Sequence, residues 1–178
     1  MLHRLAFTTA CALLASIAIQ AQASKVTKET IPGVTNFARL ETTVACGGAT
    51  KAEAVPEIKK LGFRSIINVR EASEPGAEMD KEAAAAKTAG INFVNVPFDV
   101  ASPAPDLVDR FLAAVTAKDN VPAYIHCAAG GRAAGLWMIK RVQVDGWDEA
   151  RALEEATALG LNERIKPFAL DYIHAHKR

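Results

Sequence analysis

The residues best suited to chemistry lie in one short segment, His126-Cys127-Ala128-Ala129-Gly130-Gly131-Arg132. A cysteine thiolate is a strong nucleophile, and a guanidinium can donate to two oxygens of one anion. The small residues between them let backbone N–H groups turn inward and form a nest for an anion. Cys127 is therefore predicted to be the catalytic nucleophile. The predicted substrate-binding residues are Ala128, Ala129, Gly130, Gly131 and Arg132.

The flanking sequence explains how this segment would be held. Residues 121–125 form a short apolar run typical of a buried strand, and residues 132–142 have a helical pattern. A helix N-terminus adds unpaired N–H donors and a positive dipole end, which favour the thiolate over the thiol. A lone cysteine is more often a small core residue, but the order strand, cysteine, loop, arginine, helix favours catalysis. His126 either steadies the thiolate or simply packs in the strand.

Strands and helices alternate along the rest of the chain. Apolar, β-branched runs predict strands, and a 3.6-residue apolar period or an Ala-rich run predicts helices. The predicted strands are 37–45, 64–69, 91–96 and 121–125, and the predicted helices are 51–61, 76–89, 104–118, 132–142, 147–159 and 163–174. This order predicts an α/β domain with a mostly parallel four- or five-stranded sheet flanked by helices. In such folds ligands bind beyond the carboxyl ends of the strands, where Cys127 lies.

The motif H-C-A-A-G-G-R resembles the signature loop of cysteine-dependent phosphatases of the protein-tyrosine and dual-specificity superfamily. The chain is most similar to small bacterial phosphatase-like domains, such as that of β-lactamase-hydrolase-like proteins. The resemblance includes Cys46-Gly47-Gly48, Ile67-Asn68-Val69-Arg70, Val96-Pro97-Phe98 and Gly135-Leu136-Trp137. It implies a dual-specificity-phosphatase-like fold. It also implies hydrolysis of phosphate monoesters through a cysteinyl-phosphate intermediate, with a phosphorylated protein or small molecule as substrate.

One departure from that pattern keeps two alternatives open. Four residues separate Cys127 from Arg132, where the classical phosphatase loop has five, so five loop amides instead of six face an oxyanion. Rhodanese-type sulfurtransferases, whose cysteine carries a persulfide, share the shorter spacing. The alternatives are therefore a sulfurtransferase acting through a Cys127 persulfide and a non-catalytic module that binds oxyanions.

A phosphatase of this kind needs a general acid to protonate the leaving oxygen. Asp99 is the favoured candidate, because it follows strand 91–96 in a proline-rich loop placed to overhang the site. Asp106 is the rival, although an acid in the first turn of a helix is common for electrostatic reasons alone. Arg70 and Glu71 follow another strand on the same edge. Arg70 is expected either to add charge to the anion pocket or to be a surface ion-pair partner.

The first 23 residues are interpreted as a secretory signal peptide. His3 and Arg4 precede an uncharged apolar run over residues 5–19, and Ala21-Gln22-Ala23 is a small-x-small cleavage site. The run is shorter than the roughly 20 residues that span a bilayer, so no stable membrane insertion is expected after cleavage. The protein is therefore expected to be exported, either periplasmic or secreted, with residues 24–178 as a single domain.

Composition and cysteine content narrow the function further. Without Arg4, the 21 lysines and arginines become 20, equal to the 20 acids, and this neutrality argues against nucleic acid as a partner. No C-x-x-C or H-x-x-x-H spacing occurs, so neither a metal nor a cofactor is expected. In an oxidising compartment Cys46 and Cys127 either pair as a disulfide or remain free thiols.

Overall fold

The computed structural model describes residues 25–177, and the predicted signal peptide lies outside this range. Its strands form one sheet in the order β1-β2-β3-β6-β4-β5. The strands are β1 (Val26–Lys28), β2 (Ala38–Leu40), β3 (Val44–Gly47), β4 (Ser65–Asn68), β5 (Asn92–Asn95) and β6 (Ala123–His126). The last four strands in that order are parallel to one another, while β2 runs antiparallel to both of its neighbours, β1 and β3. The predicted mostly parallel α/β architecture is confirmed, with six strands in place of four or five.

The extra strands arise at the N-terminal side of the sheet. The segment 37–45, predicted as one strand, is a hairpin of β2 and β3, and its tight turn is closed by a hydrogen bond from the Thr43 N–H to the Leu40 carbonyl (3.0 Å). Glu41 adopts a positive φ of 45° in this turn. Residues 26–28, which lie before the first predicted strand, form β1, which pairs with β2 at the edge of the sheet.

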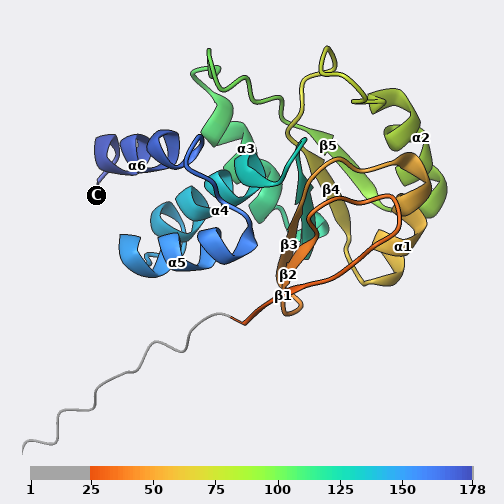
Figure 1. The fold of residues 1–178 in the computed structure, drawn as a ribbon, viewed down its shortest axis with the longest axis horizontal. Coiled ribbons are helices and arrows are strands. Elements are labelled where there is room, and N and C mark those ends of the chain that lie inside the picture. Colours follow the sequence, from red (N-terminus) through yellow and green to blue (C-terminus); the bar gives the residue numbers. More distant parts are fainter. Residues whose placement is uncertain (1–24, 178) are drawn as a thin grey trace, which may run out of the picture.

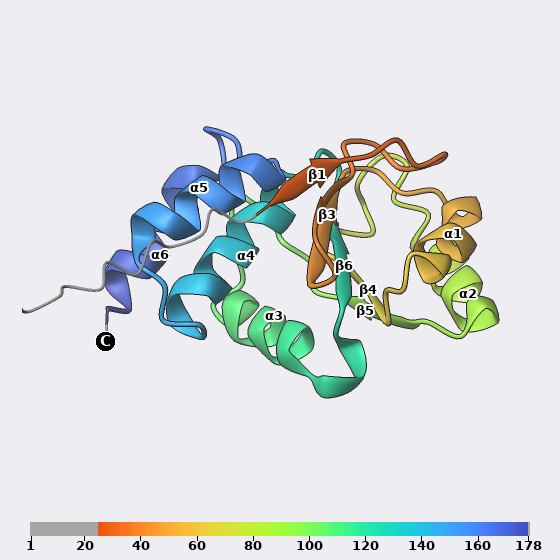
Figure 2. The same ribbon diagram turned by 90° about the horizontal axis from the view of Figure 1, so that it is seen from below.

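The helices cover the two faces of the sheet unequally. In Figures 1 and 2, α1 and α2 lie on one face, and α3 to α6 lie on the other. The helices are α1 (Val55–Lys60), α2 (Met79–Ala89), α3 (Leu107–Thr116), α4 (Gly131–Gln143), α5 (Glu149–Leu159) and α6 (Lys166–Ala175), with 3-10 turns at Ala52–Ala54 and Lys118–Asn120. No helix within residues 25–177 is both long and apolar enough to span a membrane.

The central strand β6 shows how sequence alternation places the chemistry. Tyr124 packs in the core beneath α1 and α2, and His126 stacks on its ring. Ile125 and Cys127 belong to the core on the opposite face, against α4. Successive strand residues point to opposite faces, so His126 and Cys127 lie on different sides of the sheet although they are adjacent in sequence.

The parallel strands end together. In the strand register, Gly47, His126, Asn68 and Asn95 form one row across the sheet. Each is the last residue of its strand, so the segments that follow meet at one edge. Strand β6 lies between β3 and β4, where the connections reverse direction, and this is the place at which open α/β sheets bind ligands.

Candidate active site

Cys127 lies immediately beyond β6, at the base of a loop that leads into α4. Its backbone N–H donates to the Gly47 carbonyl (3.2 Å), which continues the pairing with β3 for one more residue. The Cys127 Sγ accepts a hydrogen bond from the Gly130 N–H (3.1 Å). Gly130 has a φ of 99°, a conformation that favours glycine, and α4 begins at the next residue. The loop therefore turns back over the thiol and delivers a helix N-terminus to it.

Contacts outside the loop fix the direction of its peptide groups. The Ala128 carbonyl accepts from the Ala49 N–H (3.0 Å), and the Ala129 carbonyl accepts from the Asn36 Nδ2 (3.2 Å). In a planar trans peptide the carbonyl and the following N–H point in opposite directions. Because both carbonyls point outward, the N–H groups of Ala129 and Gly130 point inward. These two N–H groups are thus directed so that they could donate to an anion near Cys127.

Glycine is required where the loop meets its neighbours. A methyl group on Gly47 would collide with the Tyr124 hydroxyl, and one on Gly48 would collide with the Thr35 hydroxyl. A methyl group on Gly131 would collide with the Asn162 side-chain amide. The Cys46-Gly47-Gly48 sequence therefore supports the cysteine loop through close backbone packing.

Arg132 is held by three of its five donor hydrogens. Its Nη1 donates to the Glu74 Oε1 (2.6 Å) and the Phe98 carbonyl (2.7 Å), and its Nη2 donates to the Glu74 Oε2 (2.7 Å). A guanidinium has five N–H donors in a fixed planar arrangement. The Nε–H and one Nη2 hydrogen remain, and they lie parallel on one edge. This free edge can donate to two oxygens of an anion bound above Cys127.

Glu74 is the carboxylate that orients Arg132. It also accepts from the Arg70 Nε (3.3 Å) and from the Glu71 backbone N–H (2.9 Å). Burial alone would raise the pKa of Glu74, but the hydrogen bonds from Arg132, Glu71 and Arg70 outweigh it and lower the pKa to about 2. For Arg132, burial acts to lower the pKa, and Glu74 and Cys127 overcome this effect and raise it. The pair is therefore charged throughout the physiological range.

Arg70 has a different place from either of those expected. It is only 4% exposed, and its Nη atoms donate to the carbonyls of Pro75 (2.6 Å) and Gly76 (3.0 Å). Its guanidinium thus ties down the loop after β4 that carries Glu74, and it is neither a surface ion-pair partner nor part of the pocket lining.

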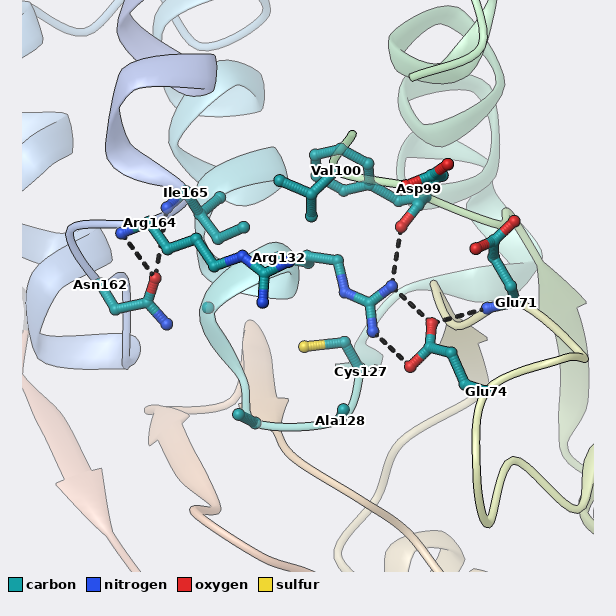
Figure 3. A pocket seen from close by; sticks show the side chains of 13 residues that line it. Glu71, Glu74, Asp99, Val100, Cys127, Ala128, Arg132, Asn162, Arg164 and Ile165 are labelled. Atoms are coloured by element: carbon teal, nitrogen blue, oxygen red, sulfur yellow. Dashed lines mark hydrogen bonds and ion pairs between the residues drawn. The ribbon is translucent and has the colours of Figure 1, made fainter. Parts of the chain in front are cut away.

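The loop and Arg132 open into a pocket of about 330 Å³. Asp99, Glu71 and Glu74 line one wall, and Asn162 and Arg164 line another (Figure 3). The predicted residues Cys127, Ala128, Ala129, Gly131, Arg132 and Asp99 all line this pocket. Gly130 is buried beneath it and contacts the thiol through its N–H.

The two candidate acids are placed differently. Asp99 lies in the pocket wall next to Phe98, and its Oδ1 accepts from the Ala101 N–H (2.8 Å) in a local turn. In Figure 3 its carboxyl group points away from the Cys127 thiol. Asp106 lies outside the pocket lining and pairs with Arg110 of its own helix (3.1 Å). Of the two acids, Asp99 is therefore the one that lines the pocket.

His126 packs behind the site. Its Nε2 lies 2.8 Å from the Glu82 Oε1, and both side chains are almost fully buried. The Asn68 Nδ2 donates to the other Glu82 oxygen (2.7 Å). His126 therefore links the end of β6 to α2 on the face of the sheet opposite Cys127.

Cys46 and Cys127 are both free thiols in the structure. Cys46 lies opposite Ile125 in the parallel register, two residues before the level of Cys127. Two residues advance a strand by about 6.6 Å, and neighbouring strands are about 4.8 Å apart, so the two Cα atoms are roughly 8 Å apart. That exceeds the roughly 7 Å limit for a disulfide. Burial, assisted by Cys127 and Glu155, raises the pKa of Cys46 and keeps it protonated.

Two charged residues of the pocket lining were not predicted from the sequence. Glu74 lies in an irregular loop with no motif around it, and Arg164 was assigned to a helix that in fact begins two residues later. No cluster of three or more His, Cys, Asp or Glu side chains that could hold a metal occurs among residues 25–177.

Comparison with known families gives the class of this fold and site. The sequence model of the phosphatase-like domain of beta-lactamase hydrolase-like proteins matches residues 37–144. This match covers more than half of the chain and includes the cysteine loop and all of α4, so the chain belongs to that family. No functionally curated protein matches the chain.

Solved structures share the fold at low sequence identity. TpbA from P. aeruginosa has a TM-score of 0.65 at 20% identity, over 89% of this chain and 93% of TpbA. A TpbA variant in complex with phosphotyrosine has a TM-score of 0.66 at 18% identity, over the same shares of the two chains. The core catalytic domain of the PP-IP phosphatase SIW14 from S. cerevisiae, in complex with citrate, has a TM-score of 0.60 at 18% identity, over 78% of this chain and 85% of that domain.

Proposed function

We propose that the protein is a phosphate-monoester hydrolase of the protein-tyrosine and dual-specificity type, with Cys127 as its nucleophile. The observation that carries this proposal is the convergence on one anion site of the Cys127 Sγ, the inward N–H groups of Ala129 and Gly130, and the free edge of Arg132. These donors surround the position where a phosphoryl group would meet the sulfur, and they would stabilise its transition-state charge.

In the proposed reaction the Cys127 thiolate attacks phosphorus, and the bond to the leaving oxygen breaks. Asp99 supplies the proton that this oxygen takes up. Water then attacks the phosphorus of the cysteinyl phosphate and gives a proton to the Asp99 carboxylate, releasing phosphate and the thiolate. Glu74 cannot replace Asp99 as the acid, because a carboxyl with a pKa of about 2 has no proton to donate near pH 7.

A sulfurtransferase acting through a Cys127 persulfide is the second candidate. The four-residue loop between Cys127 and Arg132 favours it, because one amide fewer faces the oxyanion than in the classical phosphatase loop. The direction of the Asp99 carboxyl group, away from the thiol, also suits a reaction that needs no protonated leaving oxygen.

One paired assay separates these candidates. Purified protein is given a generic aryl phosphate and, in parallel, thiosulfate with cyanide. Release of the phenol supports the phosphatase, and formation of thiocyanate supports the sulfurtransferase. If neither product forms while phosphate still binds, the protein is a non-catalytic oxyanion-binding module.

The expected cellular location follows from residues 1–23. The charge, apolar run and cleavage site found there support export to the periplasm or beyond. N-terminal sequencing of the mature protein from a periplasmic extract should begin at Ser24, and an intact Met1 would contradict cleavage.

A further inference from the structure

Arg164 is held in place beside the pocket by its backbone. It lies in the connection between α5 and α6, where the Asn162 Oδ1 accepts from the N–H groups of Arg164 and Ile165, both at 3.2 Å. Ile165 is buried and rests on Gly135 of α4, where a methyl group would lie 2.7 Å from its Cγ2. The backbone at Arg164 is thus fixed relative to α4, and its side chain points into the pocket (Figure 3).

The charges around the pocket leave Arg164 with its donors available. Arg132 is engaged by Glu74, which is also shared with Arg70. Within residues 25–177 the Arg164 guanidinium forms no ion pair and donates no hydrogen bond, although the side chain lines the same pocket. An arginine in this state can donate two parallel hydrogen bonds to a carboxylate or a phosphate.

The pocket has more room and more cationic capacity than one phosphoryl group needs. The loop N–H groups and the free edge of Arg132 already supply the donors around Cys127. A volume of about 330 Å³ lies in the range of sites for small-molecule ligands. Glu71 and Asp99 would repel a second anion on their wall, so such a group would be favoured only on the Arg164 side.

We propose that Arg164 determines specificity by binding a second anionic group of the substrate, next to the phosphoryl group held over Cys127. The substrate class is therefore a compound with two neighbouring anionic groups, such as a diphosphate or a phosphate ester beside a carboxylate. This inference rests on the proposed function, because it takes the Cys127 loop as the site of the transferred phosphoryl group.

The test measures binding in the Cys127→Ser background, where the probes are not turned over. Isothermal titration calorimetry at pH 7 gives the dissociation constants of inorganic phosphate and of inorganic diphosphate. Arg164→Ala should weaken diphosphate binding about tenfold or more, as for a lost charge-assisted hydrogen bond, and phosphate binding by less than about twofold. Lys166→Ala is the control, since it removes the same charge two residues away and outside the pocket lining.

Three results would overturn the inference. The first is an equal loss of affinity for phosphate and diphosphate in Arg164→Ala, and the second is no loss of affinity for either ion. The third is a Cys127→Ser protein that does not bind diphosphate more tightly than phosphate. Aryl phosphate turnover by the unmodified protein is scored separately. If the unmodified protein does not turn over aryl phosphate but Arg164→Ala still loses affinity for diphosphate selectively, only the proposed hydrolysis is refuted. If turnover occurs but Arg164→Ala shows no selective loss of diphosphate affinity, only the second anion site is refuted.

Discussion

The Arg132 guanidinium donates to both carboxylate oxygens of Glu74, at 2.6 and 2.7 Å, across 58 residues of sequence. Together with the bond to the Phe98 carbonyl, this contact uses the far edge of the guanidinium and leaves its near edge facing the cysteine loop. Glu74 is therefore a positioning residue, which fixes the direction of the group that would bind the substrate anion.

Replacing Glu74 with Gln should reduce kcat/KM for an aryl phosphate by roughly 10- to 100-fold, because misplacing a binding group by about 1 Å can cost that much. The amide can accept at only one of its two terminal atoms, so the paired contact with Arg132 is lost. Glu57→Gln, which changes an exposed partner of Lys60, is the matched control and should leave kcat/KM unchanged. A purely structural role would be indicated if phosphate affinity stayed constant while only the melting temperature fell.

The low pKa of Glu74 also predicts how stability depends on pH. Its pKa falls from the ordinary 4.5 to about 2 in the folded protein, so the unfolded state binds more protons in this range. The resulting stabilisation is complete above about pH 4.5 and is lost as the pH falls towards about 2. Chemical denaturation over this window should show a smaller decline for Glu74→Gln than for the unmodified protein. Parallel curves for the two proteins would contradict the pairing.

Cys127→Ser should nearly abolish aryl phosphate turnover, because the serine hydroxyl does not ionise near neutral pH while the anion site remains. The protein should still bind inorganic phosphate. Cys46→Ala is the control: Cys46 is fully buried two residues before the level of Cys127, and its loss should leave turnover intact. Turnover that survived Cys127→Ser would remove the nucleophile assignment.

Asp99→Asn should slow turnover of substrates with poor leaving groups by roughly 10²- to 10⁴-fold. The loss should be smaller with nitrophenyl phosphate, whose leaving group needs less protonation. Asp106→Asn serves as the control, since Asp106 pairs with Arg110 away from the pocket. Rates are compared across a series of leaving groups, and a uniform loss for Asp99→Asn would point to binding or structure instead of proton transfer.

The sequence predicted the parallel part of the fold well because each strand carries its own signals. Residues 64–69, 91–96 and 121–125 are apolar runs with Gly or Pro beside or within them. The bounds of β4 and β5 lie within one residue of the predicted ones, while β6 begins two residues later than predicted and ends one residue later. The β2–β3 hairpin was missed because its turn uses Glu41 at positive φ, where a glycine or asparagine would have marked it.

The pocket residues predicted from the sequence either share one loop or, like Asp99, directly follow a predicted strand. Cys127 and Arg132 are joined by a single loop, so their spacing alone indicates a shared anion site. Glu74 and Arg164 reach the pocket from connections after β4 and after α5, and their positions depend on packing such as Ile165 on Gly135. Nothing in the local sequence of either residue distinguishes it from an ordinary surface charge.

Because Cys46 is buried, the rate at which its thiol is alkylated reports how often the protein unfolds. Its side chain is inaccessible in β3, at the centre of the sheet, and the pKa of its thiol is raised. An alkylating reagent can therefore reach it only when the sheet opens, whereas Cys127 lines an open pocket. Cys127 is labelled first, and the alkylation of Cys46 is then followed in native buffer and in denaturant. The ratio of the native rate to the denatured rate gives the fraction of molecules that are open at any moment. The chain thus carries its own probe of global stability, with no fluorophore or isotope needed.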